Sequence, residues 1–397
     1  MVLANRYVLI EVSGAKLEQE FLDFPSHLYK EDKNFIRPLD QDVNAIFNRQ
    51  KNKLYRNGDS KRWLLMDDKD QTLGRIAAFY NHAVAKANDQ PTGGIGFFDC
   101  INDKEAAALL FDACRDWLKE NGMEAMDGPV NYGDRDSFWG CLVDGFYEPL
   151  YNMPYNFPYY QELFESYGFK NYFNQYTYHR TTEPGGVDPV IEEKANRIYN
   201  NPDYHFETIN LKNTDKYAED FMVIFNKAWA RFPGVKKLSK SHAVALLRKM
   251  KPIMDPRLVL YGYYKEDPIA FFIMMPDIYQ IIRKFKGKFN LINKLRLLYL
   301  LRVRKTCTRI VGRIFGVVPE HQGKGVEGGI IKAFQEVISA SRNFQYTDLE
   351  MNWIGDFNPS MMKVCEQIGS KIRKTHVTYR YLFDRTKTFN RSRRVNI

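Results

Sequence analysis

The sequence predicts a mixed α/β protein built from two similar halves. Its 397 residues exceed one typical domain and suit two of about 200 residues each. A break lies at residues 181–189, where two Pro and two Gly occur within nine residues. The predicted order of strands and helices before the break recurs after it. We therefore expect an α+β fold with a mixed sheet, in domains at 1–183 and 190–385, followed by a basic tail at 386–397.

The elements of the first half follow from apolar periodicity. Strands are predicted at 7–12, 62–66, 72–81 and 94–99. Helices are predicted at 17–29, 104–120 and 159–167. A strand pair that ends at His179 closes this half.

The second half repeats this order. Strands are predicted at 204–210, 257–264, 269–275, 308–318 and 347–353. Helices are predicted at 215–230, 239–249, 325–341 and 359–368, and a terminal strand pair at 371–383. In both halves a Glu precedes by three residues the Gly that ends the last helix, and a Lys follows (Gly168 and Gly369). An internal repeat accounts for this match.

Composition and charge indicate the cellular location of the protein. The chain carries a formal net charge of +10 and five cysteines without CxxC spacing, which fits a reducing cytosol rather than a disulfide scaffold. We see no signal peptide and no apolar run long enough to span a bilayer. The expected location is cytoplasmic, with peripheral contact to the inner membrane as a further expectation.

Residues 313–329 carry the clearest chemistry. A β-branched strand runs into Pro319, and a Gln-Gly-Lys-Gly loop at 322–325 then opens a long amphipathic helix. The first turn of such a helix presents unpaired N–H groups and the positive end of the helix dipole. Glycines at 323 and 325 let a phosphate approach the backbone, and Lys324 adds positive charge. The arrangement predicts a pyrophosphate site.

This segment resembles the V-x-P-x-x-[RQ]-G-x-G-x-[GA] signature of GNAT acetyltransferases, and residues 358–371 resemble their later N-x-x-A-x-x-L-Y-E-K-x-G-F signature. More narrowly, nearly the whole chain is similar to bacterial tandem-GNAT proteins of largely unassigned activity. The matching motifs are Gly128-Pro129, Gly145-Phe146, Asn156-Phe-Pro-Tyr-Tyr160, Pro276-Asp277 and Glu350-Met-Asn-Trp353. The resemblance implies two tandem GNAT-like domains.

The resemblance also implies an N-acyltransferase whose donor is acetyl-CoA or a longer acyl-CoA. The donor would lie between two parallel strands that splay apart and end at Val318 and Trp353. Backbone amides at 315–317 would bind the thioester carbonyl and stabilise the oxyanion. The residues expected at the donor are Phe315, Val317, Val318, Gln322, Gly323, Lys324, Gly325, Val326, Gly328 and Asn358.

The acceptor amine must lose a proton before it attacks. Glu350, directly or through water, is the first candidate for the general base and Asp356 the second; a structural ion pair is the alternative for Glu350. The Tyr that usually protonates the leaving thiolate is replaced by Cys365, which is either a donating thiol or a core residue. Tyr379, Tyr381 or solvent are the other candidates for this step.

Two further positions depart from the family pattern. Glu327 stands where most GNAT proteins have Gly or Ala, and its carboxylate repels a pyrophosphate unless it points away. The first half has no glycine and two acids at 100–105, so we expect it to bind no CoA. Its Asn156, Tyr159 and Tyr160 are expected to line the acceptor cleft or the seam between domains; the alternative is that the Tyr pair simply packs.

The insert at 278–305 is basic and amphipathic. Ten Lys or Arg and no Asp or Glu lie between residues 278 and 309. Five apolar residues fall on one helical face: Leu291, Ile292, Leu295, Leu298 and Tyr299. The insert is either a helix on an anionic membrane surface or a lid packed on the domain with a solvated basic face. Nucleic acid is not an expected partner, because only the Lys/Arg density supports it.

We therefore expect an acyl-CoA-dependent N-acyltransferase acting on an amine acceptor, such as a lipid or sphingoid-like base. One alternative is a Fem-like transferase that uses aminoacyl-tRNA, and another is a non-catalytic GNAT-fold module at the membrane surface. No HxH or HExxH motif is present, so no metal is expected. The glycines at 323–329 satisfy neither a P-loop nor a dinucleotide fingerprint.

Overall fold

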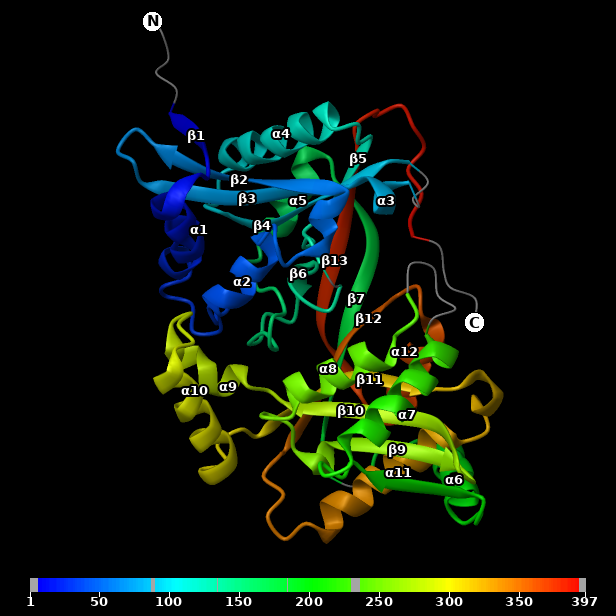
Figure 1. Cartoon of the computed structure of the whole chain (residues 1–397). Helices are drawn as coiled ribbons and strands as arrows, with labels where there is room; N and C mark the ends of the chain where they lie inside the picture. The colour runs from blue at the N-terminus through cyan, green and yellow to red at the C-terminus, as the bar shows by residue number, and fades with distance from the viewer. Residues whose placement is uncertain (1–5, 87–89, 134, 184, 230–235, 393–397) are drawn as a thin grey trace, which may run out of the picture.

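The computed structural model describes residues 6–86, 90–133, 135–183, 185–229 and 236–392. Two lobes of strands and helices are joined by long strands (Figure 1). The first half contains β1 (Tyr7–Glu11), α1 (Gly14–Leu28), α2 (Asp40–Phe47), β2 (Gly58–Asp67), β3 (Thr72–Asn81), α3 (His82–Ala85), β4 (Thr92–Cys100), α4 (Lys104–Glu120), β5 (Ala125–Gly128), β6 (Cys141–Asp144), α5 (Tyr160–Tyr167) and β7 (Lys170–Thr181).

The second half begins after the break in the sequence. It contains α6 (Pro189–Tyr199), β8 (Tyr204–Thr208), α7 (Thr214–Ala228), α8 (Lys240–Met250), β9 (Val259–Tyr264), β10 (Asp267–Pro276), α9 (Tyr279–Ile282), α10 (Leu291–Leu298), the π-helix η4 (Tyr299–Val303), β11 (Arg309–Val317), α11 (Val326–Ala340), β12 (Asp348–Gly355), α12 (Pro359–Gln367) and β13 (Lys371–Leu382). The mixed α/β prediction is confirmed.

The strands of the described residues form one 13-stranded mixed sheet. Its order is β1-β2-β3-β4-β5-β13-β7-β12-β11-β10-β9-β8, and β6 pairs with β13 off this path. The pairs β4–β5 and β11–β12 are parallel, and the others are antiparallel. Each half therefore contributes a five-stranded block that has the same internal order.

The two long strands β7 and β13 exchange partners between the halves. β13 ends the second half, yet its last residues pair with β5 of the first half. β7 ends the first half, yet it pairs with β12 of the second half. The two strands also pair antiparallel with each other, from Lys371↔His179 to Arg380↔Lys170, and run side by side between the lobes (Figure 1). The break at 181–189 thus divides the chain but not the sheet.

The strand pairs predicted at 169–179 and 371–383 are therefore wrong. Each segment is a single strand of 12 residues. A turn within either segment would have satisfied the backbone locally, but the long strands find partners on both edges from other parts of the chain. Three of the described helices were not predicted, namely α2, α3 and α6. The predicted helix end at Ala230 lies outside the described residues.

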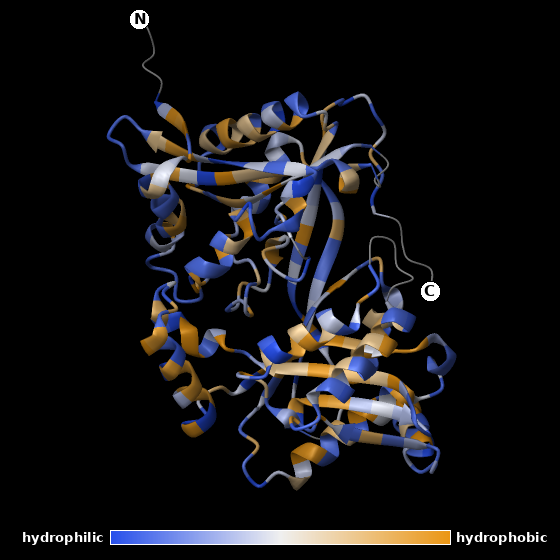
Figure 2. Ribbon diagram, viewed as in Figure 1, coloured by the Kyte–Doolittle hydropathy of each residue, from blue (hydrophilic) through white to orange (hydrophobic). Residues whose placement is uncertain are grey.

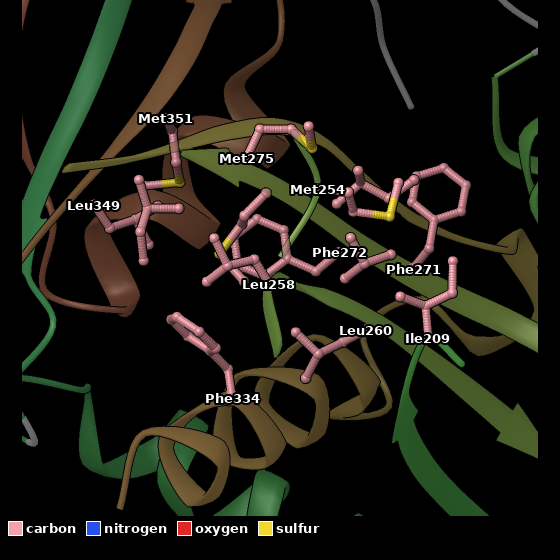
Figure 3. Close-up of a cluster of buried hydrophobic side chains, with 14 of the residues drawn as sticks. Ile209, Met254, Leu258, Leu260, Phe271, Phe272, Met275, Phe334, Leu349 and Met351 are labelled. Carbon is pink, nitrogen blue, oxygen red and sulfur yellow. The ribbon is translucent and has the colours of Figure 1, made fainter. Parts of the chain in front are cut away.

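Helices cover both faces of the second-half strands. Successive residues of a strand point to opposite faces, and on β10 Phe271 contacts Phe221 of α7, while Phe272 contacts Phe334 of α11. The helices α7 and α11 therefore lie on opposite faces. Figure 3 shows Phe271, Phe272 and Phe334 within the buried cluster that this arrangement creates. The described cysteines are free and buried. Among the described helices, none combines the length and the apolar character that crossing a bilayer requires.

Candidate active site

A cavity of about 430 Å³ opens where β11, the following loop, α11 and α12 meet. The loop at 322–325 and the first turn of α11 form one side, and α12 forms the other. The middle of α6 contributes Lys194, and Trp229 directly follows α7. Seven of the ten residues expected at the donor line it: Phe315, Val317, Gln322, Gly323, Gly325, Gly328 and Asn358. The structure thus brings residues from two motifs, separated in the sequence by a helix and a strand, to one cavity.

The other three expected residues do not line the cavity. Val318 and Val326 are buried in the core of the second half. Lys324 is exposed, and its backbone carbonyl accepts a hydrogen bond from Arg197 of α6 at 3.5 Å. These residues shape the loop and do not face its interior.

The strand gap lies beside this cavity. The parallel pairing of β11 with β12 covers only Arg309–Gly312 and Asp348–Met351, although both strands continue beyond it. At the same point the register of β11 against β10 shifts, so that Arg313 is an extra residue in a bulge. Past Gly312 the edge of β11 that faces β12 is free of ladder partners. Its backbone groups can therefore bind an extended ligand and polarise a carbonyl.

Glycines at the start of α11 serve two different purposes. Gly323 has φ +71° with open space around its Cα, whereas Gly325 has φ +104° and lies against α6. A Cβ at Gly325 would lie 2.8 Å from the carbonyl oxygen of Lys194, and one at Gly328 would lie 2.9 Å from the Cβ of Ala195. Gly325 and Gly328 thus permit the close approach of α6 that brings Lys194 to the cavity.

The carboxylate of Glu327 lies inside the loop. Its Oε1 accepts a hydrogen bond from the backbone N–H of Gly323 at 3.1 Å, and the residue lines the cavity. A backbone N–H that an incoming phosphate would use is therefore occupied by the chain itself. Positive charge also surrounds the cavity, since Lys194 and Lys363 both line it. An anion that enters the loop would compete with the Glu327 carboxylate for the N–H of Gly323.

Glu350 lies in a buried ionic cluster and not in the cavity. Its side chain is fully buried, and its Oε1 accepts hydrogen bonds from Lys374 and, at 2.9 Å, from Thr177. Its Oε2 lies 3.4 Å from Arg373 Nε and 3.8 Å from Arg309 NH1. Burial lowers the pKa of Lys374, and the attraction of Glu350 opposes this shift. This geometry favours the structural ion pair that was the alternative for Glu350, because the carboxylate holds several cations together; its role as a general base stays a prediction.

The remaining catalytic candidates are also displaced from the cavity. Asp356 forms an ion pair with Arg391 at 2.6 Å. Cys365 is fully buried, with its Sγ 3.6 Å from the Sδ of Met351, and burial raises the pKa of its thiol to about 12. Tyr379 is buried in the first-half core, where its hydroxyl donates to Glu165 at 3.1 Å. The position of Tyr379 follows from the strand exchange, because the end of β13 pairs with β5 of the first half.

The three first-half residues expected at the acceptor cleft do not all lie at a cavity. Asn156 and Tyr160 line a separate cavity of about 90 Å³, but both have internal roles. The Asn156 side chain bonds both backbone groups of Leu142, and Tyr160 accepts a hydrogen bond from Tyr29. Tyr159 does not line that cavity, and its hydroxyl donates to the carbonyl of Cys100 at 2.7 Å. All three side chains thus make internal hydrogen bonds, and their place at the acceptor cleft stays a prediction.

The first half has no free helix end for a phosphate at the equivalent place. The carboxylate of Asp103 caps α4 and accepts hydrogen bonds from the N–H groups of Glu105 and Ala106. The strand gap is closed as well, because the N–H of Val130 donates to the carbonyl of Ile95 at 2.7 Å. Both observations favour a donor site in the second half.

A loop of the first half reaches the point where β11 and β12 separate. Arg313 forms an ion pair with Asp136 at 2.8 Å, and the indole N–H of Trp353 donates to the carbonyl of Arg135 at 2.8 Å. Leu150 and Met153 pack on Val311. Residues of both halves therefore border the strand gap.

Comparisons with known proteins agree with this geometry. No family model matches the chain. The chain is similar in structure to a tandem GNAT protein from the clavulanic acid biosynthesis pathway, with a TM-score of 0.54 and 9% sequence identity. The match covers 96% of this chain and 100% of that protein. The chain has the tandem GNAT fold.

Two curated relatives match the tandem GNAT chain over nearly its whole length. Protein YghO of Escherichia coli (strain K12) is 25% identical over 367 residues, which are 90% of this chain and 91% of the relative. The bacterial ceramide synthase of Caulobacter vibrioides (strain NA1000 / CB15N) is 22% identical over 371 residues, which are 91% of this chain and 94% of the relative. Within the described part of the chain, no group of three or more His, Cys, Asp or Glu could hold a metal ion; that no metal is needed stays a prediction.

Proposed function

We propose that the protein is an acyl-CoA-dependent N-acyltransferase whose donor site is the second-half cavity. The observation that carries the proposal is the convergence of the free edge of β11, the loop at 322–325 and Asn358 on that cavity. The diphosphate of CoA would bind the loop and the N-terminus of α11, with Lys194 and Lys363 adding positive charge. The thioester would lie along β11, where backbone N–H groups polarise its carbonyl.

In the proposed reaction the free amine attacks the thioester carbonyl. The C–N bond forms, the C–S bond breaks, and the CoA thiolate leaves. The amine gives its extra proton to solvent or to the leaving thiolate, because Glu350 and Asp356 both serve ion pairs. Proximity and oxyanion stabilisation then supply the rate enhancement.

The acceptor that we propose is an amine on a lipid-like molecule. One relative is named as a bacterial ceramide synthase, and a ceramide is an N-acylated long-chain base.

Titration calorimetry with CoA and with a long-chain acyl-CoA tests the donor site. We expect binding, and we expect Lys363→Glu to weaken it by about tenfold, because the reversed charge lies in the cavity wall. The control is Lys371→Glu, which makes the same charge change at an exposed residue outside the cavity. The donor site is refuted if neither ligand binds, or if both variants weaken the binding of CoA equally.

A non-catalytic binding module of the same fold is the second candidate. The observation in its favour is the contact of Glu327 with the N–H of Gly323, which blocks part of the loop. Incubation with labelled acyl-CoA and a long-chain amine distinguishes the two functions. A transferase forms the amide, whereas a binding module leaves both reactants intact.

A further inference from the structure

The insert between β10 and β11 exposes an unusual apolar surface. Among the described residues, twelve large hydrophobic side chains are exposed, and five of them lie within 13 positions of the insert. Their exposed fractions range from 51% to 74%, and we call these residues the insert face: Leu291, Ile292, Leu295, Tyr299 and Val303. Figure 2 shows hydrophobic segments at this edge of the molecule, where Figure 1 places α10. Such a cluster marks a surface for a partner.

The insert face is held in place by the opposite side of the same segment. Leu297 and Leu301 are buried in the second-half core, so the segment is anchored by other apolar residues. Arg302 donates to the carbonyl of Pro252 at 2.8 Å. The N–H of Asp40 in the first half donates to the carbonyl of Gly287 at 2.9 Å. Packing therefore explains the inner side of the insert but leaves the outer face unexplained.

Positive charge surrounds the insert face. Eight exposed cationic residues lie on the segment: Lys284, Lys286, Lys288, Lys294, Arg296, Arg302, Arg304 and Lys305. No Asp or Glu lies between residues 278 and 309. Each cation near an anionic surface adds attraction that salt screens. The partner should therefore be both apolar and negatively charged.

We propose that the insert face docks on a lipid bilayer with anionic headgroups. Its side chains enter the boundary between headgroups and acyl chains, and the surrounding cations contact the headgroups. A second copy of the chain would bring two sets of like charges together. A nucleic acid would use the cations but not the five outward apolar side chains. The bilayer is the partner that uses both features.

The insert is continuous with two strands of the second half. The insert joins the end of β10 at Pro276 to the start of β11 at Arg309, and β11 borders the strand gap. The docking itself needs no acyl transfer, so it can be tested even if the proposed activity is absent.

Vesicle flotation of the full chain tests the proposal. We expect flotation with vesicles of phosphatidylcholine that contain about one third phosphatidylglycerol, and little with phosphatidylcholine alone. The variant Leu291→Ser/Ile292→Ser/Leu295→Ser should lose about tenfold or more in partitioning. The variant Lys284→Gln/Lys286→Gln/Lys294→Gln should lose a similar amount, and added salt should reduce the binding of the unmodified protein.

The control variant is Val8→Ser/Val190→Ser, which removes exposed apolar side chains elsewhere on the surface (47% and 55% exposed). It should float like the unmodified protein. Thermal melting confirms that each variant is folded. Docking is refuted if the unmodified protein does not float, if the triple serine variant of the insert face floats equally, or if anionic lipid makes no difference. Docking is also refuted if the unmodified protein does not float but self-associates, and only the triple serine variant loses this self-association. That result would indicate a second copy as the partner.

Discussion

Replacing Lys374 with methionine is expected to lower the free energy of unfolding by about 3–5 kcal/mol. Lys374 is 1% exposed and hydrogen-bonds Glu350, which is fully buried. Methionine fills much of the same volume but leaves the carboxylate without its closest cation. Urea unfolding measures the loss. The control Lys371→Met, at an exposed position of the same strand, should change stability by less than about 0.5 kcal/mol.

Glu350→Gln separates the structural role of this carboxylate from a catalytic one. A buried ion partner predicts a large loss of stability, since Lys374 then keeps an uncompensated charge. A general base predicts instead a lower kcat with unchanged stability. An unchanged unfolding midpoint in both Lys374→Met and Glu350→Gln would contradict the structural role.

Replacing Glu327 with alanine is expected to tighten the binding of CoA by about tenfold. The substitution frees the N–H of Gly323 and removes a negative charge from the cavity that would hold the diphosphate. Titration calorimetry gives the dissociation constant. The gain should shrink at high salt, because screening already weakens the repulsion in the unmodified protein.

Two further variants define how Glu327 acts. Glu327→Gln removes the charge but can keep the hydrogen bond to Gly323, so its effect should be intermediate. Glu320→Ala removes an exposed carboxylate from the short turn before the loop, outside the cavity, and should change the affinity little. Equal affinities in the unmodified protein and Glu327→Ala would show that the carboxylate leaves the loop without cost when the ligand binds.

The sequence was most informative where function depends on a local motif. The loop at 322–325 and Asn358 were predicted from short patterns, and the structure places them on one cavity. It was least informative about contacts between distant segments. Lys194 lines the same cavity, but it belongs to α6, which begins at Pro189 in a stretch interpreted as a linker. The signals for this helix were Asp188 before Pro189 and the glycines of α11 that receive it, Gly325 and Gly328.

The sequence by itself determined the fold class, the internal repeat and the half in which the cavity beside the glycine loop forms. These depend on periodicity, on glycine conformation and on residues close together in the chain. Only the tertiary structure decided which residues can act there. The exchange of β7 and β13 moved Tyr379 into the other half, and the cations of β13 and β11 made Glu350 part of a buried ionic cluster. Strand pairing is non-local, so residues from both halves set the environment of each side chain.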